Sequence, residues 1–321
     1  MSDDVILKSW RKSGKNMRIK RCLFPGCTSD NIIKCHVFQN NGVLTQISDK
    51  GDVYMPKMRG NDMVPRITKF GRKMATVFTG FCGEHDKKVF QPIEDKNWKA
   101  NSETAFLFFY RTFASQMQAK QEYVKRSDLL AKDLDRSLNK NEVVSGYMMA
   151  VDDFKRDKRL VDDYLIKHER VPINYIFWTI HQPIKFAFSG FTTPYYDFEG
   201  HEIQTVRADV NRHIFITVLP HGNEAIAIIT WLKVDDRKVR GYISGLRKLT
   251  LAQRKQYLSN IAISTTDDLV LSPSIVNQLS QPQRSLIEGE YEMMHLFAEM
   301  TGITNGAKSE CEEIGLNLFD F

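Results

Sequence analysis

The sequence predicts an α+β fold, because its strand signals and helix signals occur in separate blocks instead of alternating along the chain. Closely spaced cysteines are confined to residues 1–100, apolar residues recur at helical spacing in residues 101–170, and β-branched and aromatic runs dominate residues 171–321. These observations predict an N-terminal ββα module held together by a metal ion, a central helical hairpin or connector, and a C-terminal α+β region with an antiparallel sheet.

The overall composition is that of a globular protein. Of the 321 residues, 42% are hydrophobic and 26% are charged, which supplies enough apolar material for a core. No run approaches the roughly 18 apolar residues of a membrane-spanning helix, so we expect no membrane partner. The N-terminus begins with two acids and lacks an apolar signal segment, so we expect a cytoplasmic location.

The positive charge is concentrated in the first third of the chain. Residues 1–100 hold 19 Lys and Arg against 10 Asp and Glu, a net charge of +9, whereas the remainder holds 26 against 29, a net charge of −3. Two basic clusters of this kind indicate a polyanion such as nucleic acid, and a solvated basic surface is the alternative. The clusters comprise Lys8, Arg11, Lys12, Lys15, Arg18, Lys20 and Arg21, and then Lys57, Arg59, Arg66, Lys69, Arg72 and Lys73.

Local patterns predict short elements in the first 100 residues and longer ones afterwards. In the N-terminal part we expect strands at 31–38, 43–47 and 53–55, a basic loop at 56–74, and a helix at 83–91 stopped by Pro92. The middle part predicts a helix beginning at Asn101–Ser102, a second stretch with Leu130, Leu134 and Leu138, and a helix containing Val144 to Phe154. The last part predicts strands at 173–180, 184–189, 203–208, 213–219 and 225–232, the last two as a hairpin, and helices at 241–262 and 281–300.

Four of the five cysteines lie between residues 22 and 82, a clustering that indicates metal binding in a reducing compartment. Six side chains compete for the four positions of a tetrahedral zinc ion: Cys22, Cys27, Cys35, His36, Cys82 and His85. Cys35 and His36 are neighbours on an expected strand and point to opposite faces. We therefore assign structural Zn²⁺ to the two outer pairs, Cys22–Cys27 (CxxxxC) and Cys82–His85 (CxxH), each at a turn or helix start. Buried, metal-free thiols are the alternative.

The order CxxxxC, strand histidine, CxxH-Asp resembles a treble-clef zinc module of the HNH nuclease superfamily, over residues 20–91 only. The resemblance implies a metal-dependent endonuclease acting on DNA. It places His36 as the general base that activates water, and Asp86 at the helix position that contributes to the catalytic Mg²⁺ or Mn²⁺ site. The four zinc ligands would then have a structural role.

The residues suit that chemistry in part. Phosphodiester cleavage needs a base with a pKa near neutral, which imidazole provides, and a hard divalent cation, which a carboxylate binds. The chain departs from the family pattern in three ways. Asp86 stands where the family has Asn or His, Cys35 instead of an acid precedes His36, and 54 residues separate Cys27 from Cys82.

Other readings stay open. The segment FCGEHDKKVFQPIE, residues 81–94, is similar to bacterial proteins that join such a module to an unassigned C-terminal region, and some HNH-like proteins of this kind belong to phage-defence systems. The alternative function is a non-enzymatic zinc-stapled module that binds nucleic acid or a protein. In a third hypothesis the C-terminal region is the enzyme and the zinc module directs it to its target. The C-terminal region is also where we expect a protein partner or a second copy of the chain to bind. It contains no GxGxxG or GxxxxGK motif, and we interpret its histidines as structural.

Overall fold

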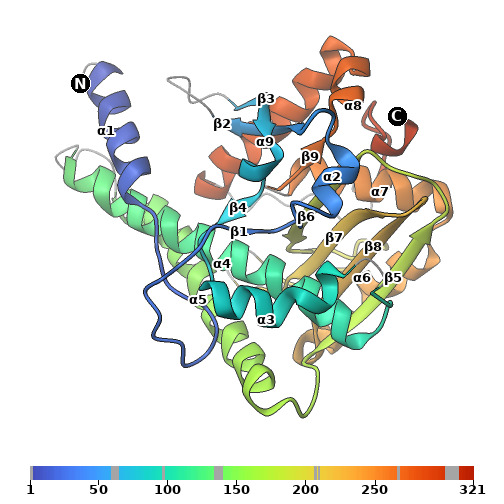
Figure 1. Cartoon of the computed structure of the whole chain (residues 1–321), viewed down its shortest axis with the longest axis horizontal. Helices are drawn as coiled ribbons and strands as arrows, with labels where there is room; N and C mark the ends of the chain where they lie inside the picture. Colours follow the sequence, from blue (N-terminus) through green and yellow to red (C-terminus); the bar gives the residue numbers. More distant parts are fainter. Residues whose placement is uncertain are drawn as a thin grey trace.

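The computed structural model describes residues 3–58, 65–95, 98–133, 140–205, 208, 210–265, 268–300 and 311–321, and the statements below concern these residues. Its main sheet contains seven strands: β2 (Asp52–Met58), β3 (Pro65–Gly71), β5 (Ile173–Ile180), β6 (Phe186–Thr192), β7 (Ile214–His221), β8 (Glu224–Leu232) and β9 (Val270–Leu271). The strand order is β3-β2-β9-β6-β7-β8-β5 with antiparallel pairing throughout (Figure 1). The fold is therefore α+β with antiparallel sheets, as predicted.

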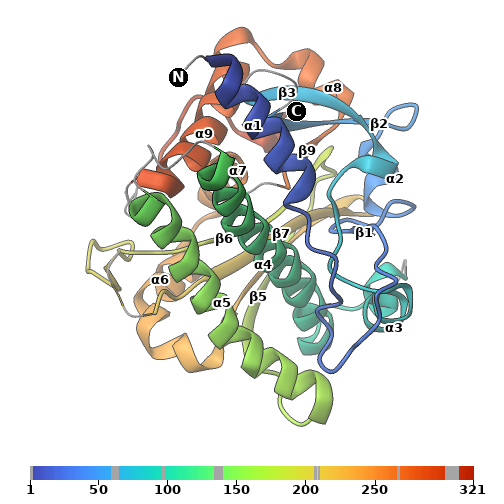
Figure 2. The ribbon, with the colours of Figure 1, turned by 90° about the vertical axis from the view of Figure 1, so that its left-hand side faces the viewer.

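Helices cover both faces of this sheet. On one face lie α4 (Ser102–Asp133) and α5 (Lys140–Lys167), which pack side by side (Figure 2). On the other lie α6 (Asp236–Lys248) and α7 (Leu251–Ser264). Alternate residues of β7 supply the two cores: Phe215 and Leu219 face α4, whereas Ile216 faces α6 and α7. Because both faces are buried, β7 and β8 form continuous apolar runs in the sequence.

The metal-ligand region forms a smaller ββα unit. Strands β1 (Cys35–His36) and β4 (Val77–Phe78) pair antiparallel, and α3 (Gly83–Glu94) follows them. Between β1 and β4 the chain inserts α2 (Val43–Ile47), β2, β3 and the 3-10 turn η1 (Arg72–Met74). Tyr54 of β2 pairs with Leu271 of β9. The main sheet thus takes strands from both the first and the last of the three predicted segments.

The remaining elements frame this body. Helix α1 (Asp3–Asn16), which we did not predict, packs on α4. Helix α9 (Gln281–Met300) covers the edge strand β3, where Glu288 accepts a 3.0 Å hydrogen bond from the amide of Ile67. An edge strand needs such cover because its amides are otherwise unpaired. The turn η2 (Lys233–Asp235), α8 (Pro273–Gln278) and η4 (Leu318–Asp320) complete the fold, and none of the described helices is long and apolar enough to cross a membrane.

Several predicted elements are confirmed. The strand predicted at 173–180 is β5, and the hairpin predicted from 213–219 and 225–232 is β7–β8, whose turn holds Gly222 at a φ of +64°. Within residues 101–170, α4 and α5 are two long helices that pack on each other, as expected for a hairpin. Leu134 and Leu138 lie outside the described residues.

Three N-terminal predictions were wrong. Residues 43–47 form the helix α2, not a strand, because the buried Leu44 and Ile47 are three residues apart and share one helical face. The expected loop at 56–74 contains β3, whose charged side chains are tolerated because β3 is an edge strand; residues 59–64 lie outside the described residues. Pro92 lies inside α3, in its last turn, where it removes only one hydrogen bond.

Smaller differences concern element length. The strand expected at 31–38 is reduced to Cys35–His36, with one further bridge between Ile32 and Cys82. Residues 203–205 form no strand, and 206–207 lie outside the described residues. The helix expected at 241–262 is divided into α6 and α7, because Thr250 caps α7 with a capping box.

Close packing at Gly245 of α6 gives a test of the fold. A Cβ atom there would lie 2.1 Å from Cδ2 and 2.9 Å from Cβ of Phe198, so Gly245→Ala should lower the free energy of unfolding by about 1–3 kcal/mol. At Gly289 of α9 nothing lies within 4 Å of such an atom, so Gly289→Ala should raise it by about 0.4–1 kcal/mol. Urea unfolding of both variants measures this, and equal effects would contradict the packing described.

Candidate metal centre and the residues beside it

The first pair of ligands lies on a tight turn. The amide of Cys27 donates to the carbonyl of Phe24 at 3.2 Å, and Gly26 has a φ of +73°, which favours glycine. The amide of Leu23 donates to the carbonyl of Gly80 at 2.8 Å. The turn therefore brings the thiols of Cys22 and Cys27 together and fixes them beside the segment that leads into α3.

The second pair lies at the start of α3. Cys82 is the residue immediately before the helix and His85 lies in its first turn, so both side chains face the same way. The amide of Ile33 donates to the carbonyl of Phe81 at 3.0 Å, and Ile32 bridges to Cys82. The segment that follows the turn with Cys22 and Cys27 thus holds the start of α3 in place.

The four ligand atoms have the spacing that a tetrahedral zinc ion needs. Sγ of Cys82 lies 3.9 Å from Sγ of both Cys22 and Cys27, and Nδ1 of His85 lies 3.6 Å from Sγ of Cys22 and 3.2 Å from Sγ of Cys82. Zn–S bonds of about 2.3 Å and Zn–N bonds of about 2.0 Å separate two sulfurs by about 3.8 Å and a sulfur from a nitrogen by about 3.5 Å. Among the described residues this is the one such cluster, and it could hold a metal ion such as zinc.

The surroundings suit a structural ion. Cys22 and Cys82 are buried, and the ring of His85 stacks on Phe24 with centroids 4.0 Å apart. Burial raises the pKa of the Cys22 thiol to about 11. For Cys82 burial acts in the same direction, but hydrogen bonds from the amides of His85 and Glu84 and from the neighbouring thiols lower the pKa below its ordinary value. A bound cation would supply the charge that stabilises all three thiolates.

The predicted base, His36, lies outside this cluster and is half-buried on β1. Its Nδ1 lies 3.0 Å from the carbonyl oxygen of Ala75, so Nδ1 carries the proton and Nε2 keeps its lone pair. Burial, together with the positive charge of Arg111, lowers the pKa of His36, although the bond to Ala75 and the charge of Asp86 act against that shift. His36 is therefore neutral at pH 7.

Asp86 lies one residue beyond the last metal ligand, in the first turn of α3. Its Oδ1 is buried and has no hydrogen-bond partner within the described ranges. Its neighbour is the buried thiol of Cys35, whose pKa is raised well above its ordinary value by burial and then by the charge of Asp86. A buried carboxylate oxygen without a partner calls for a donor or a cation. Asp86 and His36 also interact electrostatically, so the structure brings the two predicted residues into one neighbourhood.

Arg111 belongs to the same neighbourhood, and our sequence reasoning missed it. Its side chain is 4% exposed, its Nη2 lies 2.6 Å from Oε1 of Glu94, and its guanidinium lies 4.2 Å from the ring centre of Phe90. The signal was present in the sequence LFFYRTFA, residues 107–114, where one arginine interrupts an apolar helical run. Such a residue is buried only when it is paired.

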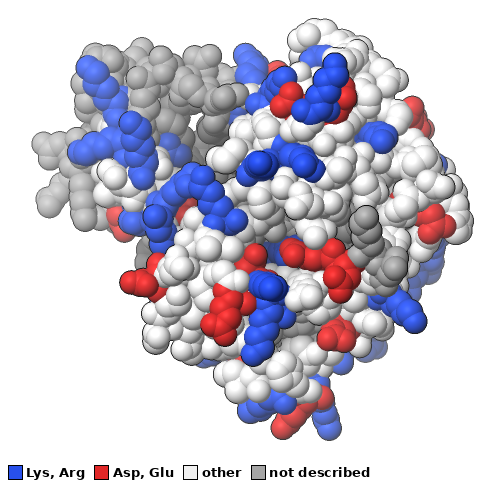
Figure 3. Space-filling model, viewed as in Figure 1, with Lys and Arg blue, Asp and Glu red and all other residues white. Residues whose placement is uncertain are grey.

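The predicted basic surface is partly engaged in other contacts. Arg66 pairs with Glu288 at 3.1 Å, Lys69 with Asp52 at 2.6 Å, and Arg72 donates to the carbonyl of Asn40 at 3.2 Å. Arg59 lies outside the described residues. Figure 3 shows Lys and Arg over the upper part of this face and Asp and Glu around a hollow near its middle. Nucleic acid therefore stays a predicted partner.

The other histidines have structural surroundings. His213 is buried between Phe154, Phe191 and Phe215, and burial lowers its pKa to about 3. His213 and His221 lie at opposite ends of β7, and His221 contacts Trp98.

Comparisons with known proteins add no identity. No family model matches this chain, and no curated protein or solved structure matches it. The resemblance to HNH modules therefore depends on residues 20–91 and on the geometry above.

The ligand assignment can be tested by metal content. Cys22→Ser and Cys82→Ser should each reduce bound zinc from about one ion per chain to below about 0.2 and weaken folding of the N-terminal unit, because a three-ligand site binds zinc poorly. Cys35→Ala should keep its zinc, because Cys35 lies outside the cluster. Elemental analysis of dialysed protein gives the ratio, and zinc loss in Cys35→Ala alone would refute the assignment.

Proposed function

We propose that this protein is a metal-dependent, zinc-stapled HNH-like endonuclease in which His36 is the general base and Asp86 holds the catalytic cation. The observation that carries the proposal is the hydrogen bond from Nδ1 of His36 to the carbonyl oxygen of Ala75. A general base needs its accepting nitrogen free and its tautomer fixed. This bond does both, since it leaves the lone pair on Nε2.

The low pKa of His36 supports the same role. A base must be unprotonated before it can accept a proton, and burial with the charge of Arg111 keeps His36 neutral. In the proposed reaction Nε2 removes a proton from water, and the resulting hydroxide attacks the phosphorus of a phosphodiester. The P–O bond to the leaving sugar oxygen breaks, and that oxygen takes a proton from solvent. His36 then carries that proton until solvent removes it.

The unpartnered Oδ1 of Asp86 supports a cation site beside His36. Mg²⁺ or Mn²⁺ would supply Lewis-acid stabilisation of the charge that develops on the phosphate oxygens. Asp86 follows His85 directly in α3, so a structural zinc ion on His85 would also fix the backbone of Asp86. On this proposal the zinc positions the machinery without taking part in the chemistry.

The alternative is a zinc-stapled module that binds nucleic acid or protein and does not cleave phosphodiesters. Cys35 favours it, because its thiol lies against Asp86, and the other carboxylate that acts on His36, that of Glu94, is paired with Arg111. In that case the thiol of Cys35 donates to the carboxylate of Asp86, and no cation is needed there. A role in phage defence extends the nuclease proposal, and it is tested by plating phage on cells that express the parent or His36→Ala.

Plasmid nicking separates the two functions. With Mg²⁺ or Mn²⁺, His36→Ala should lose about 10²- to 10⁴-fold in rate, the usual effect of removing a general base, and Asp86→Ala should lose at least as much. His181→Ala is the matched control, because His181 is an exposed histidine directly after β5, which is the edge strand farthest from β3 in the main sheet. Unchanged zinc content in all three variants shows that folding is intact. No nicking by the parent would support the non-enzymatic module, and equal nicking by parent and His36→Ala would exclude His36 as the general base.

The pH dependence follows from the lowered pKa of His36. The active form is neutral, so kcat/KM should be constant near pH 7 and fall tenfold per pH unit only below the folded pKa, which lies under 6.5. Initial rates of nicking between pH 5 and 8 measure this, with bound zinc measured at each pH because acid also protonates the thiolate ligands. An inflection above pH 7 while zinc stays bound would exclude His36 as the base.

A further inference from the structure

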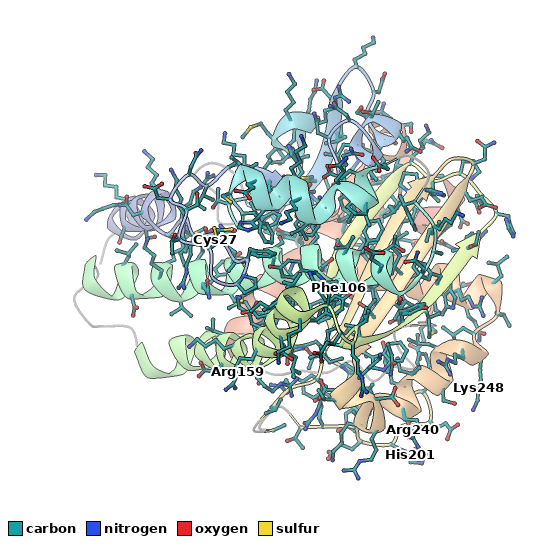
Figure 4. All side chains as sticks on the ribbon, turned by 60° about the horizontal axis from the view of Figure 1, so that its bottom comes forward. Cys27, Phe106, Arg159, His201, Arg240 and Lys248 are labelled. Carbon is teal, nitrogen blue, oxygen red and sulfur yellow. The ribbon has the colours of Figure 1, made fainter. Side chains whose placement is uncertain are left out.

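A second polar site lies away from the metal centre, where the end of β8 and helix α6 meet the start of β5. It is a pocket of about 550 Å³, within the usual range for small-molecule sites. Its walls come from β5, β8, α6 and the residues beside α4 and α5. Figure 4 shows Arg240 of α6 well separated from Cys27 of the metal centre. The site is therefore independent of the proposed nuclease residues.

Three cations line this pocket: Lys233, Arg240 and Arg247. All three are exposed, and none of their side chains has an ion pair or hydrogen bond to a residue that the structure describes. Arg240 and Arg247 are seven residues apart on α6, and they therefore project from the same helical face.

Asp236 is the one acid in the wall, which leaves two net positive charges. Its Oδ1 accepts hydrogen bonds from Nδ2 of Asn174 at 2.8 Å and from Nε1 of Trp231 at 2.9 Å. These bonds hold the carboxylate in place. Its Oδ2 makes no hydrogen bond within the described part of the chain and so remains an acceptor for a hydroxyl group.

Tyr175 supplies an aromatic surface at the same site. It lies on β5, the edge strand, and is 39% exposed, which is unusual for a large apolar residue of this chain. Its ring packs edge-on against Phe177 with centroids 5.6 Å apart, so it is held in one orientation. Tyr175 alternates with Asn174 along β5, so its ring lies at the α4 end of the pocket, whereas the arginines line the α6 end. This arrangement suits a ligand with a ring at one end and an anionic group at the other.

We propose that this pocket binds a nucleotide, with the phosphate groups on Arg240, Arg247 and Lys233, a ribose hydroxyl on Oδ2 of Asp236, and the base against Tyr175. Two net positive charges match a dianionic phosphate, and arginine forms paired hydrogen bonds with phosphate oxygens. The same chemistry is offered by a free nucleotide and by the phosphorylated end of a nucleic acid strand.

Equilibrium dialysis of the full-length, zinc-loaded protein without added Mg²⁺ tests this proposal. The probes are ATP, pyrophosphate, adenosine and a 5′-phosphorylated DNA 12-mer. ATP and pyrophosphate should bind and adenosine should bind at least tenfold more weakly than ATP. Binding of the 12-mer without ATP would assign a strand end as the source, and binding of ATP would assign a free nucleotide. Binding of neither, or equal binding of adenosine and ATP, would overturn the site.

Variants locate the binding. Arg240→Gln with Arg247→Gln should weaken ATP binding at least 100-fold, on the order of tenfold for each arginine, and Tyr175→Ala should weaken ATP but not pyrophosphate. Lys238→Gln is the matched control, because Lys238 is an exposed cation on the opposite face of α6. His36→Ala should bind ATP like the parent, which separates this site from the nuclease proposal. Equal loss in Lys238→Gln and the double variant would refute the proposed contacts.

Discussion

Helix α4 is the element on which the rest of the structure depends, because residues 104–118 are buried on every side. Tyr110 contacts Phe81 and Phe90 of the metal-ligand unit and donates to the carbonyl of Leu23 in the cysteine turn at 3.3 Å. Phe109 contacts Phe215 of the main sheet, and Phe106 contacts Tyr164 of α5. Because this stretch is buried on every side, the metal-ligand unit, the sheet and α5 stabilise α4 together.

This arrangement separates two roles at the N-terminal end. The Cys3His cluster connects the turn before β1 to the start of α3, whereas His36 and Asp86 lie beside it on those same two elements. Arg111 adds a link from α4, since its charge acts on His36 and its guanidinium pairs with Glu94 of α3. Loss of an ion bound by this cluster would therefore change the relative position of all three residues, although none of them belongs to the cluster.

The Cys3His cluster could be predicted from the sequence, whereas most of the framework that supports it could not, for physical reasons. Ligand spacing is a local property, since Cys82 and His85 need only one turn of helix to face one ion. Strands β5, β7 and β8 were also predictable, because runs of β-branched and aromatic residues favour strands. The turn with Gly222 further indicates that β7 and β8 form a hairpin. By contrast, α2 depends on which of its five residues find a buried surface, and β3 is a strand only because β2 and α9 lie beside it. The burial of Arg111 required knowing that Glu94 and Phe90 surround it. These features depend on contacts between segments that are far apart in the sequence, so the local residue pattern does not predict them.

The pairing of Tyr54 with Leu271 joins the 54-residue insertion to the far end of the chain. In an independent zinc module that insertion would make no contact with the rest of the chain, and the module could move relative to the main body. Here β2 is hydrogen-bonded between β3 and β9, so the ligand turn, β1 and α3 are held at both ends by the main body. Any polymer that reaches His36 must therefore be accommodated by the whole molecule, and the unit could not be transferred to another protein without its sheet.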